Sequence, residues 1–249
     1  MSYVDGRTAV QSNLRGADVV MLAAVVNRHV FSFMARPEIK RLSELKGKRI
    51  GVTRIGSTTH TIALYVTQQA GLKPEEYQIL PLFEVPNILT ALLAGQIDAG
   101  PLSPPTNIRA RKAGLSELIN LARDGPEYVS VALGSTRSYI KANEEIARRV
   151  IRSYVEAVHH LKANKAVALK VMQKYVRVTD PEILEATYAE VREYLESVPY
   201  VSRKGLESII SELATTEPKA KEVKPEDFLD ARFLRQLEKD GFFKTVSAK

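Results

Sequence analysis

Short apolar runs alternate with amphipathic segments along the first half of the chain, from Val19 to about Ser135. This alternation is typical of the strands and crossover helices of a parallel sheet, so the pattern predicts an α/β fold. Runs rich in β-branched and aliphatic residues predict strands over Val19–Val26, Arg49–Ile55, Tyr77–Phe83, Gln96–Leu102, Leu118–Ala122 and Tyr128–Leu133. Amphipathic segments that are followed by a glycine predict helices over Ser57–Ala70, Pro86–Ala94 and Pro105–Ala113.

The second half of the chain, after about Asn143, carries helical periodicity and no strand signal. Apolar stripes of helical spacing begin at Val150, Ile183 and Leu206. The stretch Glu217–Pro225 contains three lysines and two prolines and predicts a solvated linker, after which Pro225–Asp240 predicts a final helix. This half of the chain is therefore expected to form helices that pack on the rest.

One strand–helix–strand unit occurs twice in the sequence. The first copy runs from Asp5–Thr8 to Arg15–Asp18 and into a strand, and the second runs from Asp98–Pro101 to Lys112–Gly114 and into a strand. Two such units predict two pseudo-equivalent lobes.

Composition adds limits to this picture. The chain has 249 residues, of which 45% are hydrophobic, enough to build cores in one large domain or in two lobes. Its net charge is +7, but the basic residues are spread along the chain, aromatic residues make up only 7%, and no recognition motif occurs. We therefore expect no nucleic-acid partner. The longest apolar run, Val19–Val26, is far shorter than the roughly 20 residues that span a bilayer.

Several catalytic motifs are absent from the sequence. It contains no cysteine, so it has no disulfide, no thiolate zinc site and no thiol nucleophile. The patterns His-Glu-x-x-His, Gly-x-Ser-x-Gly and Gly-x-Gly-x-x-Gly do not occur. The spacing of Gly51 and Gly56 imitates a phosphate-binding loop, but Ser57 stands where that loop needs a lysine. We expect no catalytic residue, no metal and no cofactor.

The clearest candidate for ligand binding is the turn Gly56–His60, between a predicted strand and a predicted helix. Backbone N–H groups and the positive end of the helix dipole favour an anion there, and Ser57, Thr58 and Thr59 add hydroxyl donors. His60 follows on the first helical turn, where it could face a ligand or pack against the protein. Serine and threonine are also preferred N-caps of any helix, so simple capping stays an alternative.

Other candidates stand at the ends of predicted strands. The carboxyl ends of parallel strands converge on one edge of a sheet, which is where open α/β sheets bind ligands. Arg54, Glu84, Ser103 and the Asp5–Thr8 turn all lie at or just after such ends. Arg54 and Arg7 could each neutralise an acidic ligand or be an ordinary surface charge.

The order and spacing of several motifs resemble one protein family over essentially the whole chain. The motifs are Leu42-Ser-Glu-Leu-Lys-Gly-Lys-Arg-Ile-Gly-Val52, Gly56-Ser-Thr-Thr-His60, Ala91-Leu-Leu-Ala-Gly-Gln-Ile-Asp98, Leu102-Ser-Pro-Pro105, and Pro225-Glu-Asp-Phe-Leu-Asp230 with Gly241-Phe242. Together they resemble the periplasmic solute-binding proteins of ABC importers, in the nitrate-, sulfonate- and taurine-binding group that is related to binders of thiamine-pyrimidine precursors.

The resemblance implies a type II periplasmic-binding-protein-like α/β fold. Such a fold has two lobes with parallel-type sheets, joined by crossing segments that are expected at Arg36–Pro37 and about Ala132–Ser138. The expected parts are a remnant of the first lobe over 1–36, the second lobe over 37–134, and C-terminal helices over 135–249 that pack on the first lobe.

The resemblance also implies a function without catalysis. The chain would bind a small anionic or polar organic solute between its lobes, close around it, and deliver it to an ABC permease in the membrane, in a periplasmic or other extracytoplasmic location. The ligand-binding residues would be Arg7, Thr8, Arg54, Ser57, Thr58, Thr59, His60 and Ser103.

The start of the chain departs from the family pattern. Full members have a signal peptide and a further strand–helix–strand–helix stretch before the equivalent of Tyr3, and neither is found in this sequence. The first lobe is therefore expected to be incomplete. Its exposed sheet edge would invite pairing with another chain, so we expect either a truncated chain or a homo-oligomer that covers this edge.

Two related proteins supply alternative functions. Thiamine-pyrimidine synthase-like enzymes share the fold, but they use a cysteine-rich motif, a histidine and pyridoxal phosphate, and this sequence has no cysteine. The effector domain of a LysR-type transcription regulator is also a two-lobed α/β module, but it requires an N-terminal helix-turn-helix that is not found in this sequence.

Overall fold

The computed structural model describes residues 1–247 and divides into two compact units. Unit 1 comprises Met1–His29, Gly125–Tyr175 and Tyr188–Lys249, and unit 2 comprises Val30–Asp124 and Val176–Thr187. Each unit has its own sheet and its own cores.

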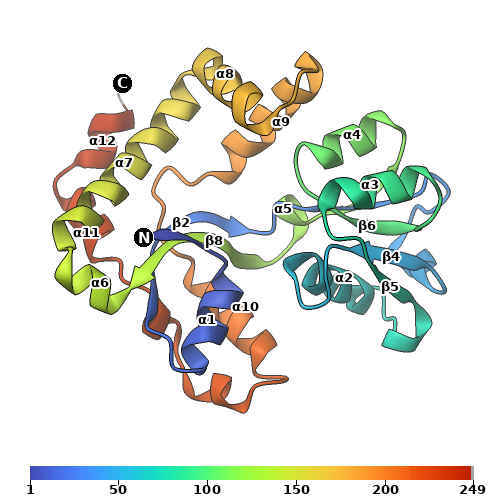
Figure 1. Cartoon of the computed structure of the whole chain (residues 1–249), viewed down its shortest axis with the longest axis horizontal. Helices are drawn as coiled ribbons and strands as arrows, with labels where there is room; N and C mark the ends of the chain where they lie inside the picture. The colour runs from blue at the N-terminus through green and yellow to red at the C-terminus, as the bar shows by residue number, and fades with distance from the viewer. Residues whose placement is uncertain (248–249) are drawn as a thin grey trace. The chain divides into compact units, whose positions relative to one another are not determined.

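The sheet of unit 1 has three strands in the order β1-β8-β2. These strands are β1 (Ser2–Val4), β8 (Glu127–Thr136) and β2 (Val19–Arg28). Both β1 and β2 run antiparallel to β8, with Tyr3 opposite Leu133 and Val20 opposite Ser135. In Figure 1, β2 and β8 lie side by side as the two long strands of this unit.

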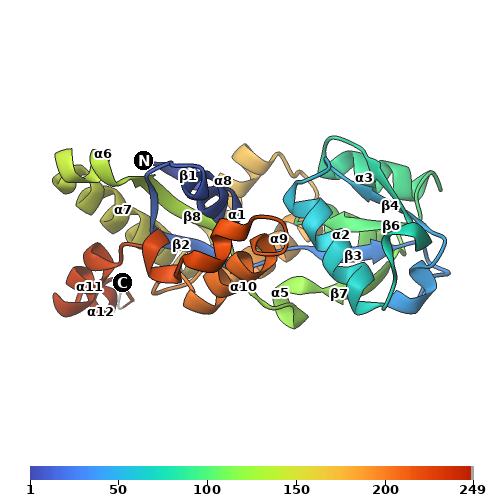
Figure 2. The ribbon, with the colours of Figure 1, turned by 90° about the horizontal axis from the view of Figure 1, so that it is seen from below.

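Helices cover both faces of this sheet because successive side chains of a strand point to opposite sides. Val20 and Leu22 of β2 pack with α7 (Glu144–Ala163) and α11 (Arg232–Lys239), whereas Met21 packs with α1 (Gly6–Leu14) and α10 (Arg203–Leu213). Figure 2 shows α1 beside α10. The remaining helices that lie wholly in unit 1 are α6 (Arg137–Ala142) and α12 (Phe242–Ser247).

The sheet of unit 2 has five strands in the order β5-β4-β6-β3-β7. They are β3 (Ser32–Ala35), β4 (Arg49–Val52), β5 (Gln78–Pro81), β6 (Ala99–Leu102) and β7 (Ser116–Asn120). Strand β4 is parallel to β5 and β6, while β3 is antiparallel to both β6 and β7.

Two cores sandwich this second sheet. Phe33, Ile50 and Val52 pack with α2 (Thr58–Gln69), and Met34 packs on the other face with α3 (Val85–Leu93) and α4 (Thr106–Lys112). Figure 1 shows α2 on one side of β4 and β6 and α3 and α4 on the other. The short α5 (Leu121–Asp124) follows β7, α8 (Lys165–Val176) lies almost wholly in unit 1, and α9 (Pro181–Tyr194) is divided between the units.

The α/β class and the repeated strand–helix–strand unit are confirmed, as β1-α1-β2 and β6-α4-β7. The expectation of parallel-type sheets is wrong for unit 1 and incomplete for unit 2. In each repeat a strand from elsewhere in the chain, β8 or β3, is inserted antiparallel between the two strands that the helix connects. Apolar patterning reports burial and not strand direction, so the sequence did not reveal this insertion.

The passages of the chain between units come earlier than the sequence predicted. The first two follow His29 and Asp124, whereas the expected crossing segments were Arg36–Pro37 and Ala132–Ser138; two further passages follow Tyr175 and Thr187. The difference arises because β3, which ends just before Arg36, and β8, which contains Ala132 to Thr136, already belong to the sheet of the unit that the chain has entered.

The C-terminal region also differs from expectation. The predicted single helix over Pro225–Asp240 is interrupted, because Leu229 bridges Met21 of β2 and Asp230 donates its N–H to the Met21 carbonyl at 2.8 Å. A 3₁₀ helix over Pro225–Phe228 precedes this break, and α11 follows it. Among the described residues no helix is long and apolar enough to cross a membrane.

Candidate functional site

Six of the predicted site residues lie in unit 2, at the carboxyl edge of two neighbouring strands. Arg54 and Ser57–His60 follow β4, and Ser103 follows β6. Ile50 of β4 lies opposite Ala99 of β6 in parallel register, so both strands end on the same side of the sheet. Arg7 and Thr8, the other two candidates, lie in unit 1.

Three hydroxyl groups build the turn between β4 and α2. The Thr53 Oγ1 lies 3.0 Å from the Ser57 Oγ and 2.8 Å from the Thr59 Oγ1, and these last two atoms are 2.9 Å apart. The backbone N–H of Thr53 also donates to the Thr59 Oγ1 at 2.9 Å. Because only 3% of Thr59 is exposed, its hydroxyl serves to hold the turn.

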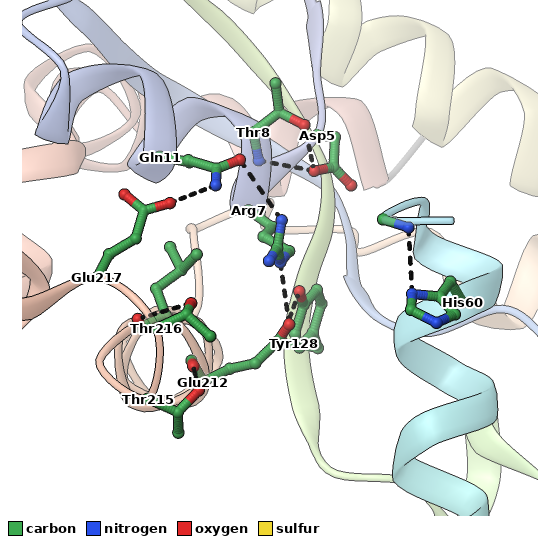
Figure 3. Close-up of polar contacts among 12 residues, drawn as sticks. Asp5, Arg7, Thr8, Gln11, His60, Tyr128, Glu212, Thr215, Thr216 and Glu217 are labelled. Carbon is green, nitrogen blue, oxygen red and sulfur yellow. Dashed lines mark hydrogen bonds and ion pairs between the residues drawn. The ribbon is translucent and has the colours of Figure 1, made fainter. Parts of the chain in front are cut away.

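Ser57 and His60 close the turn on its outer side. Ser57 is the N-cap of α2 and donates its hydroxyl to the Arg54 carbonyl at 2.7 Å. The His60 Nδ1 accepts the N–H of Gly56 at 3.1 Å, as Figure 3 shows. Gly56 has φ +81°, a conformation that a side chain would strain, so a glycine suits this corner.

The electrostatics of this turn favour an anion. Helix α2 has 12 residues, its cap is a neutral hydroxyl, and no acidic residue stands in its first turn. Arg54 is exposed and makes no ion pair with the residues that the structure describes. The helix dipole and an exposed guanidinium therefore act in the same direction here. Nearby, the carbonyl of half-buried Ser103 accepts the N–H groups of Thr106 and Asn107 at 2.8 and 3.1 Å.

The corresponding turn in unit 1 is already satisfied by its own charges. Asp5 caps α1, and its Oδ1 accepts both the N–H and the hydroxyl of Thr8, at 2.8 and 2.9 Å. The Arg7 Nε donates to the Glu212 carboxylate at 2.9 Å, and only 24% of the Arg7 side chain and 32% of the Glu212 side chain are exposed. Figure 3 shows the Asp5–Thr8 and Arg7–Glu212 contacts. This pairing compensates the positive charge that Arg7 was expected to offer a ligand.

Within unit 1, polar contacts link Glu212 to the buried residues Tyr128 and His29. The Glu212 Oε2 accepts a hydrogen bond from the Tyr128 hydroxyl at 3.2 Å, and the Tyr128 ring stacks on His29 with centroids 4.0 Å apart. The His29 Nδ1 is 3.2 Å from the Ser130 hydroxyl. Burial lowers the pKa of His29 to about 4, so the imidazole is neutral near pH 7. Burial, followed by the nearby Glu212 charge, raises the pKa of Tyr128.

Sequence reasoning missed two apolar residues that border the turn in unit 2. Phe83 follows β5, is 77% exposed and has φ +68°, a left-handed conformation that costs a non-glycine residue about 1–2 kcal/mol. Ile55 follows β4 within the turn and is 64% exposed. Both residues are the last of a predicted strand, Arg49–Ile55 or Tyr77–Phe83, but the sequence did not indicate that their side chains are exposed.

The model of the family described as "NMT1/THI5 like" matches residues 2–168. A comparison with curated proteins found no match.

Solved structures share the fold along nearly the whole chain. A protein from Bordetella bronchiseptica RB50 is 20% identical, with a TM-score of 0.78 over 96% of this chain and 81% of that one. The periplasmic aliphatic sulphonate binding protein SsuA from Escherichia coli is 18% identical, with a TM-score of 0.72 over 94% of this chain and 77% of that one. The desulfurization enzyme DSZB is 14% identical, with a TM-score of 0.73 over 96% and 85%. The fold is therefore shared by binding proteins and by an enzyme.

Proposed function

The chain belongs to the NMT1/THI5-like family, and from this premise we propose that it is the solute-binding component of an ABC importer. Its solute is a small anionic or polar organic molecule of the sulfonate, nitrate or taurine kind. Its partner is an ABC permease in the membrane, and its location is periplasmic or otherwise extracytoplasmic. The likeness in fold to a periplasmic sulphonate-binding protein supports this assignment.

The observation that carries the proposal is the turn before α2. It combines a neutral N-cap, the positive end of a 12-residue helix and the exposed Arg54 on one sheet edge. We assign the anionic group of the solute to this turn, with Arg54, Ser57, Thr58 and His60 as its contacts and Ser103 beside them. Arg7 and Thr8 take structural roles because Glu212 and Asp5 already engage them, and Thr59 takes one because its side chain is buried.

Calorimetric titration of the full chain with methanesulfonate, taurine and nitrate tests the proposal. We expect at least one of these anions to bind, and Arg54→Gln to weaken its affinity about tenfold, because an exposed cation would be lost from the anion's surroundings. Arg149→Gln is the matched control. It removes the same charge from an exposed site on α7, where the side chain is 77% exposed, and should leave the affinity unchanged. If both substitutions weakened the anion affinity equally, the loss would come from the lower net charge of the protein, which would contradict the proposed site.

The shared fold with DSZB makes catalysis the alternative to be tested. We propose binding without turnover, which the absence of any cysteine supports by removing the thiol nucleophile. Mass spectrometry of the bound solute after prolonged incubation should recover it unchanged. A converted product would establish an enzyme.

A further inference from the structure

Helix α8 carries an apolar stripe on its exposed side. Val167, Val171 and Tyr175 follow one another at intervals of four residues, so their side chains lie on one face of the helix. Their exposed fractions are 45%, 48% and 72%, whereas Ala168 and Met172 on the packed face are buried. Figure 1 shows α8 beyond the C-terminal end of α7. A row of apolar side chains that stays largely exposed in the described part of the chain indicates a contact surface.

Two lysines run along one flank of this apolar stripe. Lys170 and Lys174 are exposed, stand four residues apart, and directly precede Val171 and Tyr175. Neither lysine forms an ion pair with a residue that the structure describes. The Lys174 Nζ lies 5.2 Å from the centre of the Tyr175 ring, so a cation and an aromatic ring stand together. Because α8 contains no Asp or Glu, its surface is positive and complements an anionic partner.

The size of the apolar stripe favours a membrane surface over a folded protein as this partner. A helix of 12 residues is about 18 Å long, and only one of its faces is available. Stable protein interfaces use roughly 800 Å² on each side, which is far more than three side chains provide. A bilayer surface asks for less, because an amphipathic helix inserts its apolar side chains shallowly while its lysines stay among the headgroups. Tyrosine suits this boundary because its ring is apolar and its hydroxyl is polar.

We propose that α8 is a membrane-contact helix that rests on an anionic lipid surface. The apolar stripe would lie between the headgroups, and Lys170 and Lys174 would lie against the lipid phosphates. The net charge of +7 adds a longer-range attraction to the same surface. This inference goes beyond the proposed function, which names a solute and a permease but no lipid. It is also independent of the anion turn, because α8 belongs to unit 1 up to Tyr175 and the turn belongs to unit 2.

Sedimentation of the full chain with lipid vesicles tests the proposal. One set of vesicles contains phosphatidylcholine alone, and the other contains equal parts of phosphatidylcholine and phosphatidylglycerol. We expect the anionic vesicles to bind the protein at least about tenfold more tightly, because each lysine near an anionic surface adds to the attraction. Added salt should weaken this binding, because it screens the charges.

A pair of double variants separates the lysines of α8 from the net charge of the protein. Lys170→Gln with Lys174→Gln should weaken binding to the anionic vesicles about tenfold. Lys204→Gln with Lys239→Gln is the matched control, because it removes two charges from exposed sites on α10 and α11. We expect this control to change the affinity by less than about twofold, since its lysines lie outside the proposed contact.

A pair of single variants tests the apolar stripe. Tyr175→Ala should weaken binding to the anionic vesicles about fivefold, because the ring no longer buries apolar area among the headgroups. Tyr139→Ala on α6 is the matched control, since it removes another exposed tyrosine of unit 1, and it should leave the affinity unchanged.

Four results would overturn the inference. Absence of binding to the anionic vesicles would do so directly. Equal weakening by the two double variants would show that the attraction comes from the net charge of the protein alone. Binding of polyglutamate in place of the vesicles would assign the stripe to an acidic protein. Self-association in light scattering that Tyr175→Ala abolishes, without vesicle binding, would assign it to an interface between copies of the chain. Solute binding would stand in each case.

Discussion

Two helix N-termini in this protein follow the same local plan and differ in charge. Helix α1 in unit 1 and helix α2 in unit 2 each follow a short strand and a capped turn. Asp5 caps α1 with a carboxylate and Arg7 is neutralised by Glu212, whereas Ser57 caps α2 with a hydroxyl and Arg54 stands exposed without an ion pair to any described residue. The strand–turn–helix motif alone therefore does not define an anion site, because the charge of the cap and the partners of nearby cations decide whether the turn is already satisfied.

The largest expected effect is a loss of stability on acidification. It comes from His29 in unit 1, which stacks on Tyr128, the hydrogen-bond donor to Glu212. In the folded protein His29 stays neutral down to about pH 4, while in the unfolded chain it takes up a proton near pH 6.5. The unfolded state therefore binds more protons between these values. Stability from this group is full above pH 6.5 and falls as the pH drops, by up to about 3 kcal/mol at pH 4.

Urea unfolding of the wild type and His29→Gln at several pH values between 6.5 and 4 measures this loss. The substitution should flatten the pH dependence by removing the group that acid must charge. Identical slopes in the two proteins would show that the acid sensitivity comes from other residues.

The next effect is a change in anion affinity when the charges of the two N-caps are exchanged. Ser57→Asp retains a good N-cap but places a carboxylate where we assign the solute's anionic group, so we expect anion affinity to fall at least about a hundredfold. Asp5→Asn also retains a good cap and should leave anion affinity unchanged. Calorimetry with the tightest anion of the series provides the comparison, and undiminished binding by the Ser57 variant would place the anion elsewhere.

The smallest expected effect compares the two threonines that support these turns. Thr59→Val removes a buried hydroxyl from the Thr53 N–H and from the hydroxyl cluster, and should lower the free energy of unfolding by about 1–2 kcal/mol. Thr8→Val removes an exposed hydroxyl bonded to Asp5 and should cost about 0.5 kcal/mol or less. Urea unfolding of both variants measures the difference, and equal losses would contradict the supporting role of Thr59.

Local patterns predicted the parts of the fold that local physics determines. The apolar run at β2, the strand at β4 and the helix that Ser57 caps were all evident in the sequence. The apolar pattern gave no bounds for strands β1 and β3, because they gain their place through pairing with distant strands. Their antiparallel partners are separated from them by long stretches of chain, which no window of periodicity spans.

The candidate site was predictable in outline for the same reason. A run of serine and threonine after a strand marked the turn before α2, and the structure places it at the expected edge of the sheet. The neutralisation of Arg7 depends on Glu212, 205 residues away, and the exposure of Phe83 depends on a left-handed backbone that its sequence does not favour. Both arise from long-range packing, so they could be found only in the structure.

The way the chain is divided between the units has a consequence for its synthesis. All five strands of unit 2 lie within Val30–Asp124, so this sheet can be completed while the ribosome is still adding the long helix α7. Unit 1 must wait, because its first strands at β1 and β2 pack with α10 and α11, which emerge near the end of translation. The nascent chain therefore holds the apolar β2 without its covering helices for most of its synthesis, and a chaperone that binds extended apolar segments would meet it there.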